Sequence, residues 1–147
     1  MSIVSIAVAI LGLVFSLFTY FYCVNHERKQ ATIDAYSKLQ SEALDQLNRY
    51  TPKQVSQIAE HPHSPEYKAL AVLLARCEHF AVGVKEKIYD EHILTKLAGR
   101  YFVSLYEKLE PMILKKRSIG HRELYYAEFE ELAYRVDKRL QKENRGK

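Results

Sequence analysis

Glu78 is the side chain whose surroundings in the sequence most strongly suggest chemistry. It lies in the middle of the most apolar helix predicted after residue 26, with Ala71 and Ala75 at helical spacing before it. A carboxylate in such a place must be paired, hydrogen-bonded or protonated, because an isolated buried charge is expensive. One interpretation makes Glu78 a general acid or base. The other, which we expect, makes it a structural buried charge paired with an arginine such as Arg100 or Arg117.

The six histidines raise the question of a metal site. His61 and His63 are two residues apart in a predicted loop, and neither an HExxH nor a CxxC pattern occurs to fix two ligands on one helix face. Glu91 and His92 are neighbours in sequence and so point in different directions on a helix. The sequence has neither a Gly-rich phosphate loop nor a nucleophile elbow. It therefore predicts no catalytic residue, no metal and no cofactor.

Two basic clusters are candidates for contact with phosphate, lipid headgroups or nucleic acid. One surrounds the last predicted loop, and the other covers residues 138–147. Acidic residues lie in or around both clusters, so a solvated helix end that suits the helix dipole is the simpler interpretation. Tyrosine is frequent, with 11 in the chain. Tyr125 and Tyr126 are adjacent and so point to different faces, and one of them is expected at an interface. The residues predicted to bind a partner are Lys115, Lys116, Arg117, Arg122 and Tyr126.

An uncharged run at residues 3–24 indicates the cellular location of the protein. At about 1.5 Å per residue its 22 residues form a helix of roughly 33 Å, which matches a hydrocarbon core of about 30 Å. A cleaved signal peptide would need a basic start, a shorter apolar stretch and small residues at its end. A buried core helix would need a larger body around it. The run is therefore predicted to span a membrane, with aromatic residues near the water interface.

The distribution of basic residues predicts the orientation of this helix. No Lys or Arg precedes the run, whereas Arg28, Lys29 and Lys38 follow it closely. The positive-inside rule then places the N-terminus outside and the C-terminal body in the cytoplasm, so the expected location is the inner cell membrane. Cys23 and Cys77 are expected to stay reduced there and not to pair.

The rest of the chain, about 120 residues, is enough for one domain. Its apolar spacing is helical throughout, and no stretch alternates for long enough to predict a strand. The core residues that this spacing predicts are Leu70, Leu74, Cys77, Ala81, Val84, Ile88, Leu94, Leu97, Tyr101, Leu105, Leu109, Tyr125, Phe129, Leu132, Val136 and Leu140. Thr51 and Ser64 are predicted N-caps, each followed by a proline, and Asp90 is a third. Pro111 is expected to break or restart a helix. The predicted helices cover residues 27–50, 52–60, 65–89, 91–110 and 121–141, and residues 112–117 are predicted to form a further short turn or helix.

The predicted fold class is all-α, with one N-terminal transmembrane helix followed by a small antiparallel helical bundle of about four main helices and two short ones. Residues 1–26 would be the anchor, 27–50 a helical stalk or the first bundle helix, 51–141 the bundle and 142–147 a basic tail. The net charge of +4 is small and no basic stripe dominates, so nucleic acid is not an expected partner.

The segment from 73 to 136 resembles the DUF4760 family of small bacterial and phage proteins. The resemblance is carried by residues 74–84 (LARCEHFAVGV), 88–91 (IYDE), 106–113 (YEKLEPMI), Arg117 and 125–132 (YYAEFEEL). An N-terminal membrane helix is also familiar in such proteins. The resemblance implies the fold and topology given above, and it implies no reaction or ligand.

The predicted function is that of a single-pass, membrane-anchored interaction or regulatory module without catalytic activity. Its partners would be the lipid bilayer and another membrane protein or a second copy of itself. No small-molecule substrate is identified. Two alternatives stay open. One is a membrane-acting effector in conflict between bacteria and phages, by defence or superinfection exclusion. The other is an enzyme that uses Glu78.

Overall fold

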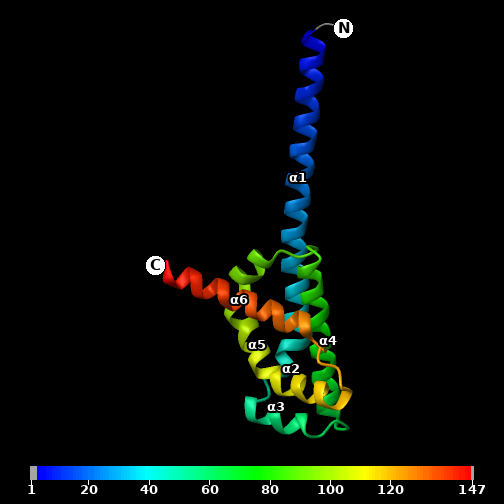
Figure 1. Cartoon of the computed structure of the whole chain (residues 1–147), viewed down its shortest axis with the longest axis vertical. Helices are drawn as coiled ribbons and strands as arrows, with labels where there is room; N and C mark the ends of the chain where they lie inside the picture. The colour runs from blue at the N-terminus through cyan, green and yellow to red at the C-terminus, as the bar shows by residue number, and fades with distance from the viewer. Residues whose placement is uncertain (1–2, 147) are drawn as a thin grey trace.

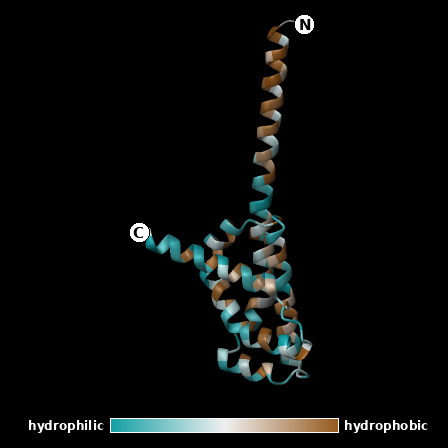
Figure 2. Ribbon diagram, in the orientation of Figure 1, coloured by the Kyte–Doolittle hydropathy of each residue, from teal (hydrophilic) through white to brown (hydrophobic). Residues whose placement is uncertain are grey.

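The first helix is the longest element of the protein. The computed structural model describes residues 3–146, without the side chain of residue 43. Helix α1 (Ile3–Leu39) continues directly into a π-helical turn, η1 (Gln40–Leu44), and then into the short helix α2 (Asp45–Leu47). Figure 1 shows the N-terminal half of α1 standing free of the body, and Figure 2 shows that this half is mostly apolar. Among the described residues, one helix is thus long and apolar enough to cross a membrane.

Residues 3–24, called the apolar segment from here on, do not pack against the body. The share of the most apolar part of this helix that is buried is 0%, so the alternative of a buried core helix is wrong. Further along α1 one face becomes buried, through Thr32, Tyr36 and Leu39. The part of α1 after residue 27 therefore packs as the first helix of the bundle and is not a free stalk.

The remaining helices are α3 (Pro52–Ala59), α4 (Pro65–Lys85), α5 (Glu91–Gly120) and α6 (Ala127–Arg145). The predicted caps are confirmed. Thr51 forms a complete capping box with Gln54, Ser64 accepts a hydrogen bond from the N–H of Tyr67, and Asp90 caps α5. No strand occurs between residues 3 and 146, which confirms the all-α class.

The core lies where α4, α5 and α6 meet on the buried face of α1. A series of ring contacts runs through it. The ring centroids of Phe80 and Phe102 lie 6.1 Å apart, those of Phe102 and Phe129 5.3 Å, and those of Phe129 and Tyr106 5.5 Å. Phe102 and Phe129 are fully buried, and such burial contributes about 1.5–3 kcal/mol for each large apolar side chain. The predicted helical bundle is thus a packed domain.

The predicted break at Pro111 is wrong. Helix α5 runs through Pro111, and its non-helical backbone lies instead at Ala98, with φ −150° and ψ 18°. At the next residue, Gly99, the side chain of Leu140 comes within 3.3 Å of the position that a Cβ would take. The helix therefore bends where α6 crosses it closely. At Pro111 the buried residues on either side hold the helix together despite the missing N–H.

The buried face of α5 is centred differently from the predicted one. A face through Leu97 and Tyr101 would bury both side chains, but they are 52% and 38% exposed. The buried face runs instead through Thr95, Gly99 and Phe102, at helical spacing on both sides of the kink. Ile88, predicted as the last core residue of α4, is 58% exposed because α4 ends earlier, at Lys85.

The last helix begins at Ala127 and not at His121 as predicted. Residues 121–126 form a turn with left-handed backbone at both ends, φ 49° at His121 and φ 60° at Tyr126. A residue in this conformation cannot continue an α-helix. Helix α6 therefore starts only after Tyr126, and its first backbone N–H groups need partners from another helix.

Candidate functional site

The apolar helix is joined to the bundle by a group of three side chains, called the junction from here on: Arg28 and Thr32 of α1, and Asp90 at the start of α5. The guanidinium of Arg28 donates to the Asp90 carboxylate, with Nη2 3.0 Å from Oδ2. The backbone N–H of Asp90 donates to the Thr32 hydroxyl over 2.7 Å. Two bonds thus tie the residue that opens α5 to the helix that carries the apolar segment.

Asp90 also caps α5. Its other carboxylate oxygen accepts hydrogen bonds from the backbone N–H groups of His92 and Ile93, at 2.9 and 3.1 Å. Burial raises the pKa of Asp90, but the bonds from Arg28 and from these N–H groups outweigh it, so the pKa lies below its ordinary value. Asp90 therefore stays ionised at neutral pH, and it bonds to α1 and caps α5 at the same time.

A second set of charges lies next to the junction. Glu91 accepts from Nε of Arg135 over 2.9 Å and from Nη2 of Arg139 over 3.3 Å, which ties the start of α5 to α6. Lys85 at the end of α4 is bonded to Glu128 at the start of α6. An open hollow of about 490 Å³ is lined by Arg28, Lys85, Glu91, Arg135 and Arg139 of these groups. The hollow has charged walls of both signs.

The predicted binding residues do not form one site. Lys115 reaches α3 and pairs with Glu60 over 2.6 Å, while Lys116 lies over the ring of Tyr67, 5.9 Å from its centroid. These two cations therefore brace α5 against its neighbours α3 and α4. Hydrogen bonding to Lys115 is the main cause that lowers the pKa of Glu60.

Arg117, Arg122 and Tyr126 are brought closer together, around Tyr125. Arg117 donates to the Tyr125 carbonyl over 2.9 Å and to the Glu130 carboxylate over 2.6 Å. Arg122 lies over the ring of Tyr125, 5.6 Å from its centroid. The bond from Arg117 lowers the pKa of Glu130 against the effect of burial. Since Glu130 neutralises the half-buried Arg117, this group fixes the turn before α6 more than it offers an anion site.

Glu78 bonds to backbone and not to an arginine. Its carboxylate accepts from the N–H of Phe129 over 2.8 Å and from the N–H of Glu128 over 3.3 Å, in the first turn of α6. The predicted partner, Arg100 or Arg117, is wrong. Because Tyr126 provides no side-chain cap, Glu78 from α4 takes the role of the missing N-cap. This geometry supports the structural interpretation.

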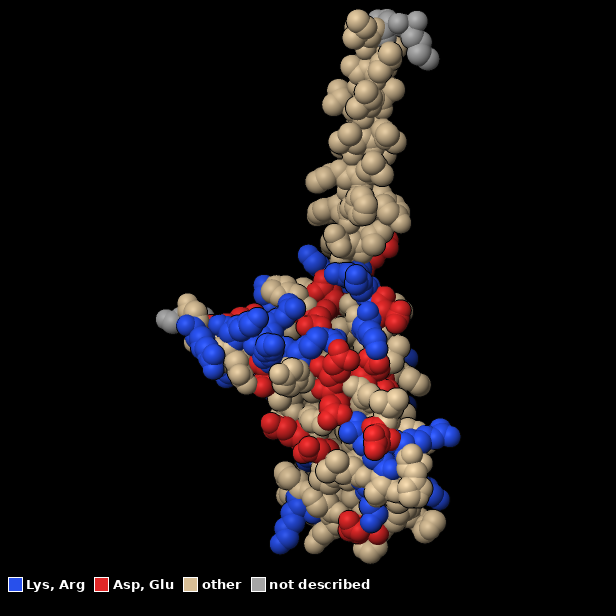
Figure 3. All heavy atoms as spheres, in the orientation of Figure 1, with Lys and Arg blue, Asp and Glu red and all other residues tan. Residues whose placement is uncertain are grey.

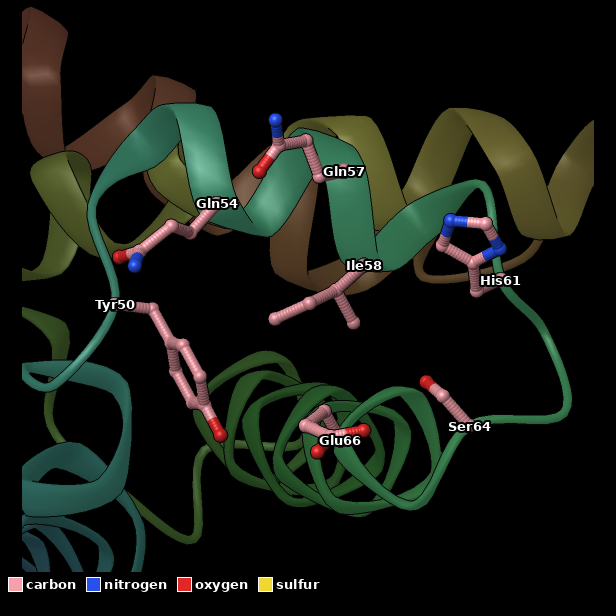
Figure 4. A pocket seen from close by; sticks show the side chains of 7 residues that line it. All are labelled: Tyr50, Gln54, Gln57, Ile58, His61, Ser64 and Glu66. Carbon is pink, nitrogen blue, oxygen red and sulfur yellow. The ribbon is translucent and has the colours of Figure 1, made fainter.

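A hollow of about 510 Å³ lies between α3 and the start of α4, at the end of the bundle farthest from the apolar segment. Figure 4 shows Tyr50 and Ile58 beside this space and Glu66 below it, with His61 and Ser64 in the connecting loop. Its walls combine apolar and polar groups without a bonded pair among the described side chains. For metals, no cluster of three or more His, Cys, Asp or Glu side chains occurs in the described part of the chain.

A feature that sequence reasoning missed lies on the apolar segment. Small residues recur at alternating spacings of four and three, which places them on one helix face. They are Ser5, Ala9, Gly12, Ser16, Thr19 and Cys23. The Ser16 hydroxyl donates to the Gly12 carbonyl and the Thr19 hydroxyl to the Phe15 carbonyl, both over 2.9 Å, so neither donor is left open. The signal was readable from the spacing alone. We call this face the small-residue stripe.

The fold and these contacts define a class of protein: a helical bundle carried directly on a long apolar helix. The family described as "Domain of unknown function (DUF4760)" matches residues 6–136, and the chain belongs to this family. The match covers most of the apolar segment as well as the body, and so extends beyond the segment that carried the resemblance. No curated protein and no solved structure matches the chain.

Glu78 provides the first prediction. Glu78→Ala should lower the free energy of unfolding by about 1–2 kcal/mol, because two N–H groups of α6 lose their acceptor. Glu78→Gln should lose less, since its amide oxygen still accepts. Hydrogen exchange should become faster at the N–H groups of Glu128 and Phe129 in Glu78→Ala. Unchanged exchange there would show that Glu78 does not cap α6.

Asp90 provides a second prediction, on pH dependence. The folded pKa of Asp90 lies below its ordinary value, so its contribution is complete above the unfolded pKa of about 3.9 and is lost as the pH falls through the folded pKa. Asp90→Asn keeps a capping side chain but removes the charge. At neutral pH it should cost about 1 kcal/mol of unfolding free energy in nonionic detergent.

The difference between the wild type and Asp90→Asn should shrink as the pH falls below the ordinary pKa of aspartate. The comparison removes the contribution of other acids such as Glu130, because both proteins contain them. Thermal unfolding followed by circular dichroism measures both curves. A difference that stays constant down to the lowest pH would contradict the ionised role of Asp90.

Proposed function

We propose that the protein is a single-pass, membrane-anchored helical module that acts by binding and not by catalysis. The observation that carries this proposal is the form of α1. Its apolar segment is long enough to cross a hydrocarbon core of about 30 Å, its side chains are exposed, and the same helix continues into the core of the bundle. A protein built in this way is stable only if the apolar segment is covered, and a bilayer covers it over its whole length.

The proposed orientation places the N-terminus outside and the bundle in the cytoplasm of the inner membrane. Basic residues support it, since Arg28, Lys29 and Lys38 follow the apolar segment closely. The bundle then lies directly at the membrane surface, because the junction at Arg28 and Thr32 holds it to α1.

The bonding partners of the charged side chains support binding over catalysis. Glu78, the strongest candidate for an acid or base, bonds to the backbone of α6. Arg117 and Lys115 are engaged by Glu130 and Glu60. These groups are used to hold helices together. Confinement to a surface makes a weak contact effective, because it raises the local concentration of both partners.

The partner that the small-residue stripe favours is another transmembrane helix, and a second copy of this chain is the simplest case. Small side chains let two helix backbones approach closely in a membrane, where van der Waals contact drives association. A Cβ added at Gly12 would meet nothing within 4 Å, so this face is open. The alternative of a membrane-acting effector would use the same association and stays a prediction.

The third prediction tests this association with two matched variants. Ala9 lies on the stripe, and Ala7 lies on the opposite face of the same helix, so Ala9→Leu and Ala7→Leu make the same chemical change in two places. Cys23 is exposed on the stripe, whereas burial raises the pKa of the Cys77 thiol to about 12 and keeps it unreactive. Oxidation in membranes should therefore cross-link two copies through Cys23.

Ala9→Leu should reduce the cross-linked fraction by about tenfold, which corresponds to about 1.4 kcal/mol of association free energy. Ala7→Leu should leave it unchanged. Equal cross-linking in the wild type and Ala9→Leu would rule out this face as the contact. A wild type that is not retained in membranes after alkaline washing would contradict the anchoring itself.

A further inference from the structure

The end of the bundle nearest the apolar segment lies within reach of lipid headgroups. Arg28 is four residues beyond Val24, which corresponds to about 6 Å along a helix. The headgroup layer on each side of a bilayer is about 5–8 Å thick. Because Arg28 is bonded to Asp90, the loop that precedes Asp90 is held at the same level. If α1 spans the membrane as proposed, this loop therefore meets the headgroups.

The loop at residues 86–89 points two side chains of fitting chemistry away from the core. The backbone N–H groups of Ile88 and Tyr89 both donate to the Gly83 carbonyl, at 2.9 and 3.0 Å, and the Tyr89 ring stacks on Phe80. Lys87 has left-handed backbone with φ 59°, and Ile88 is 58% exposed. A fixed turn thus displays a cation beside an apolar side chain, a combination suited to a membrane surface.

The outer half of α6 adds cations at the same end of the bundle. Figure 1 shows the C-terminal end of α6 level with the point where α1 enters the bundle, and Figure 3 shows Lys and Arg gathered there. Lys138, Lys142 and Arg145 form no ion pair with any described residue. Arg135 and Arg139, nearer the core, are paired with Glu91. The inner cations therefore hold the fold, and the outer ones are available.

The helix dipole alone does not explain this distribution. It favours cations in the last turn of a helix, and so accounts for Lys142 and Arg145. It does not account for Lys87 in a loop or for Lys29 in the middle of α1. What these positions share is the end of the bundle at which α1 enters it, with the end of α6 level with that point but to its side. We propose that this end of the bundle binds the anionic phospholipids of the bilayer that α1 crosses, and we call it the lipid-facing end.

This inference rests on the proposed membrane placement of α1 and deepens it, since it names a lipid class and the residues that contact it. The lipid-facing end consists of Lys29, Lys87, Ile88, Lys138, Lys142 and Arg145. Each cation near an anionic surface strengthens the contact by an amount that corresponds to about fivefold in the equilibrium. The contact would press the bundle onto the membrane and fix its tilt.

The chain has no tryptophan, so Ile88→Trp introduces a single fluorescent reporter into the loop. The full chain with this substitution is placed in nanodiscs of phosphatidylcholine, or of phosphatidylcholine and phosphatidylglycerol in a two-to-one ratio. With phosphatidylglycerol the emission should shift to shorter wavelength and acrylamide should quench it less. Salt near 1 M, where the screening length is about 3 Å, should remove the difference.

Two pairs of substitutions test the location of the contact at equal net charge. Lys142→Gln with Arg145→Gln at the lipid-facing end should weaken the response to phosphatidylglycerol by about fivefold per cation. Lys53→Gln with Lys68→Gln, both exposed at the far end of the bundle, should leave it unchanged. Equal accessibility of the reporter in both lipids, or equal effects of the two pairs, would overturn the inference. Failure of the chain to enter nanodiscs would instead overturn the membrane placement on which it rests.

Discussion

The structure depends on one constraint: a helix with an apolar segment must continue into a folded bundle without a flexible link. The bond from Arg28 to Asp90 and the bond from the Asp90 N–H to Thr32 meet this constraint. Asp90 is also the cap of α5, the helix that packs most extensively with α6. Asp90 thus both caps α5 and fixes the orientation of the apolar segment relative to the bundle.

If α1 crosses a membrane as proposed, this arrangement makes it a rigid connection between the membrane and the body. The side chains of Thr32, Tyr36 and Leu39 are buried. A rotation or shift of α1 would therefore displace side chains that pack in the core. The π-helical turn η1 (Gln40–Leu44) follows them, and such turns are frequent at functional sites. In the proposed function, pairing of apolar segments acts on the bundle through this connection.

Local signals in the sequence predicted the helices well, because caps act over a few residues. Thr51, Ser64 and Asp90 were all identified correctly from the residues next to them. The uncharged run predicted a helix that could span a membrane, and the spacing of apolar residues predicted the core positions Leu74, Cys77, Phe129 and Leu132. The family resemblance added no function, since the family is one of unknown function.

Contacts between distant residues could not be predicted. The kink at Ala98 depends on Leu140 crossing Gly99 from another helix. Glu78 bonds to backbone N–H groups 50 and 51 residues away, and such groups carry no signal because nearly every residue has one. Arg28 and Asp90 are 62 residues apart.

The measurement that tests the central claim most directly is the distance between the apolar segment and the far end of the bundle in a bilayer. Spin labels at Cys23 and at Lys53→Cys, with unlabelled chain in excess, report it by pulsed electron paramagnetic resonance. A body held to α1 by the junction predicts a single narrow distance distribution. A broad or multiple distribution would contradict the rigid connection between apolar segment and bundle.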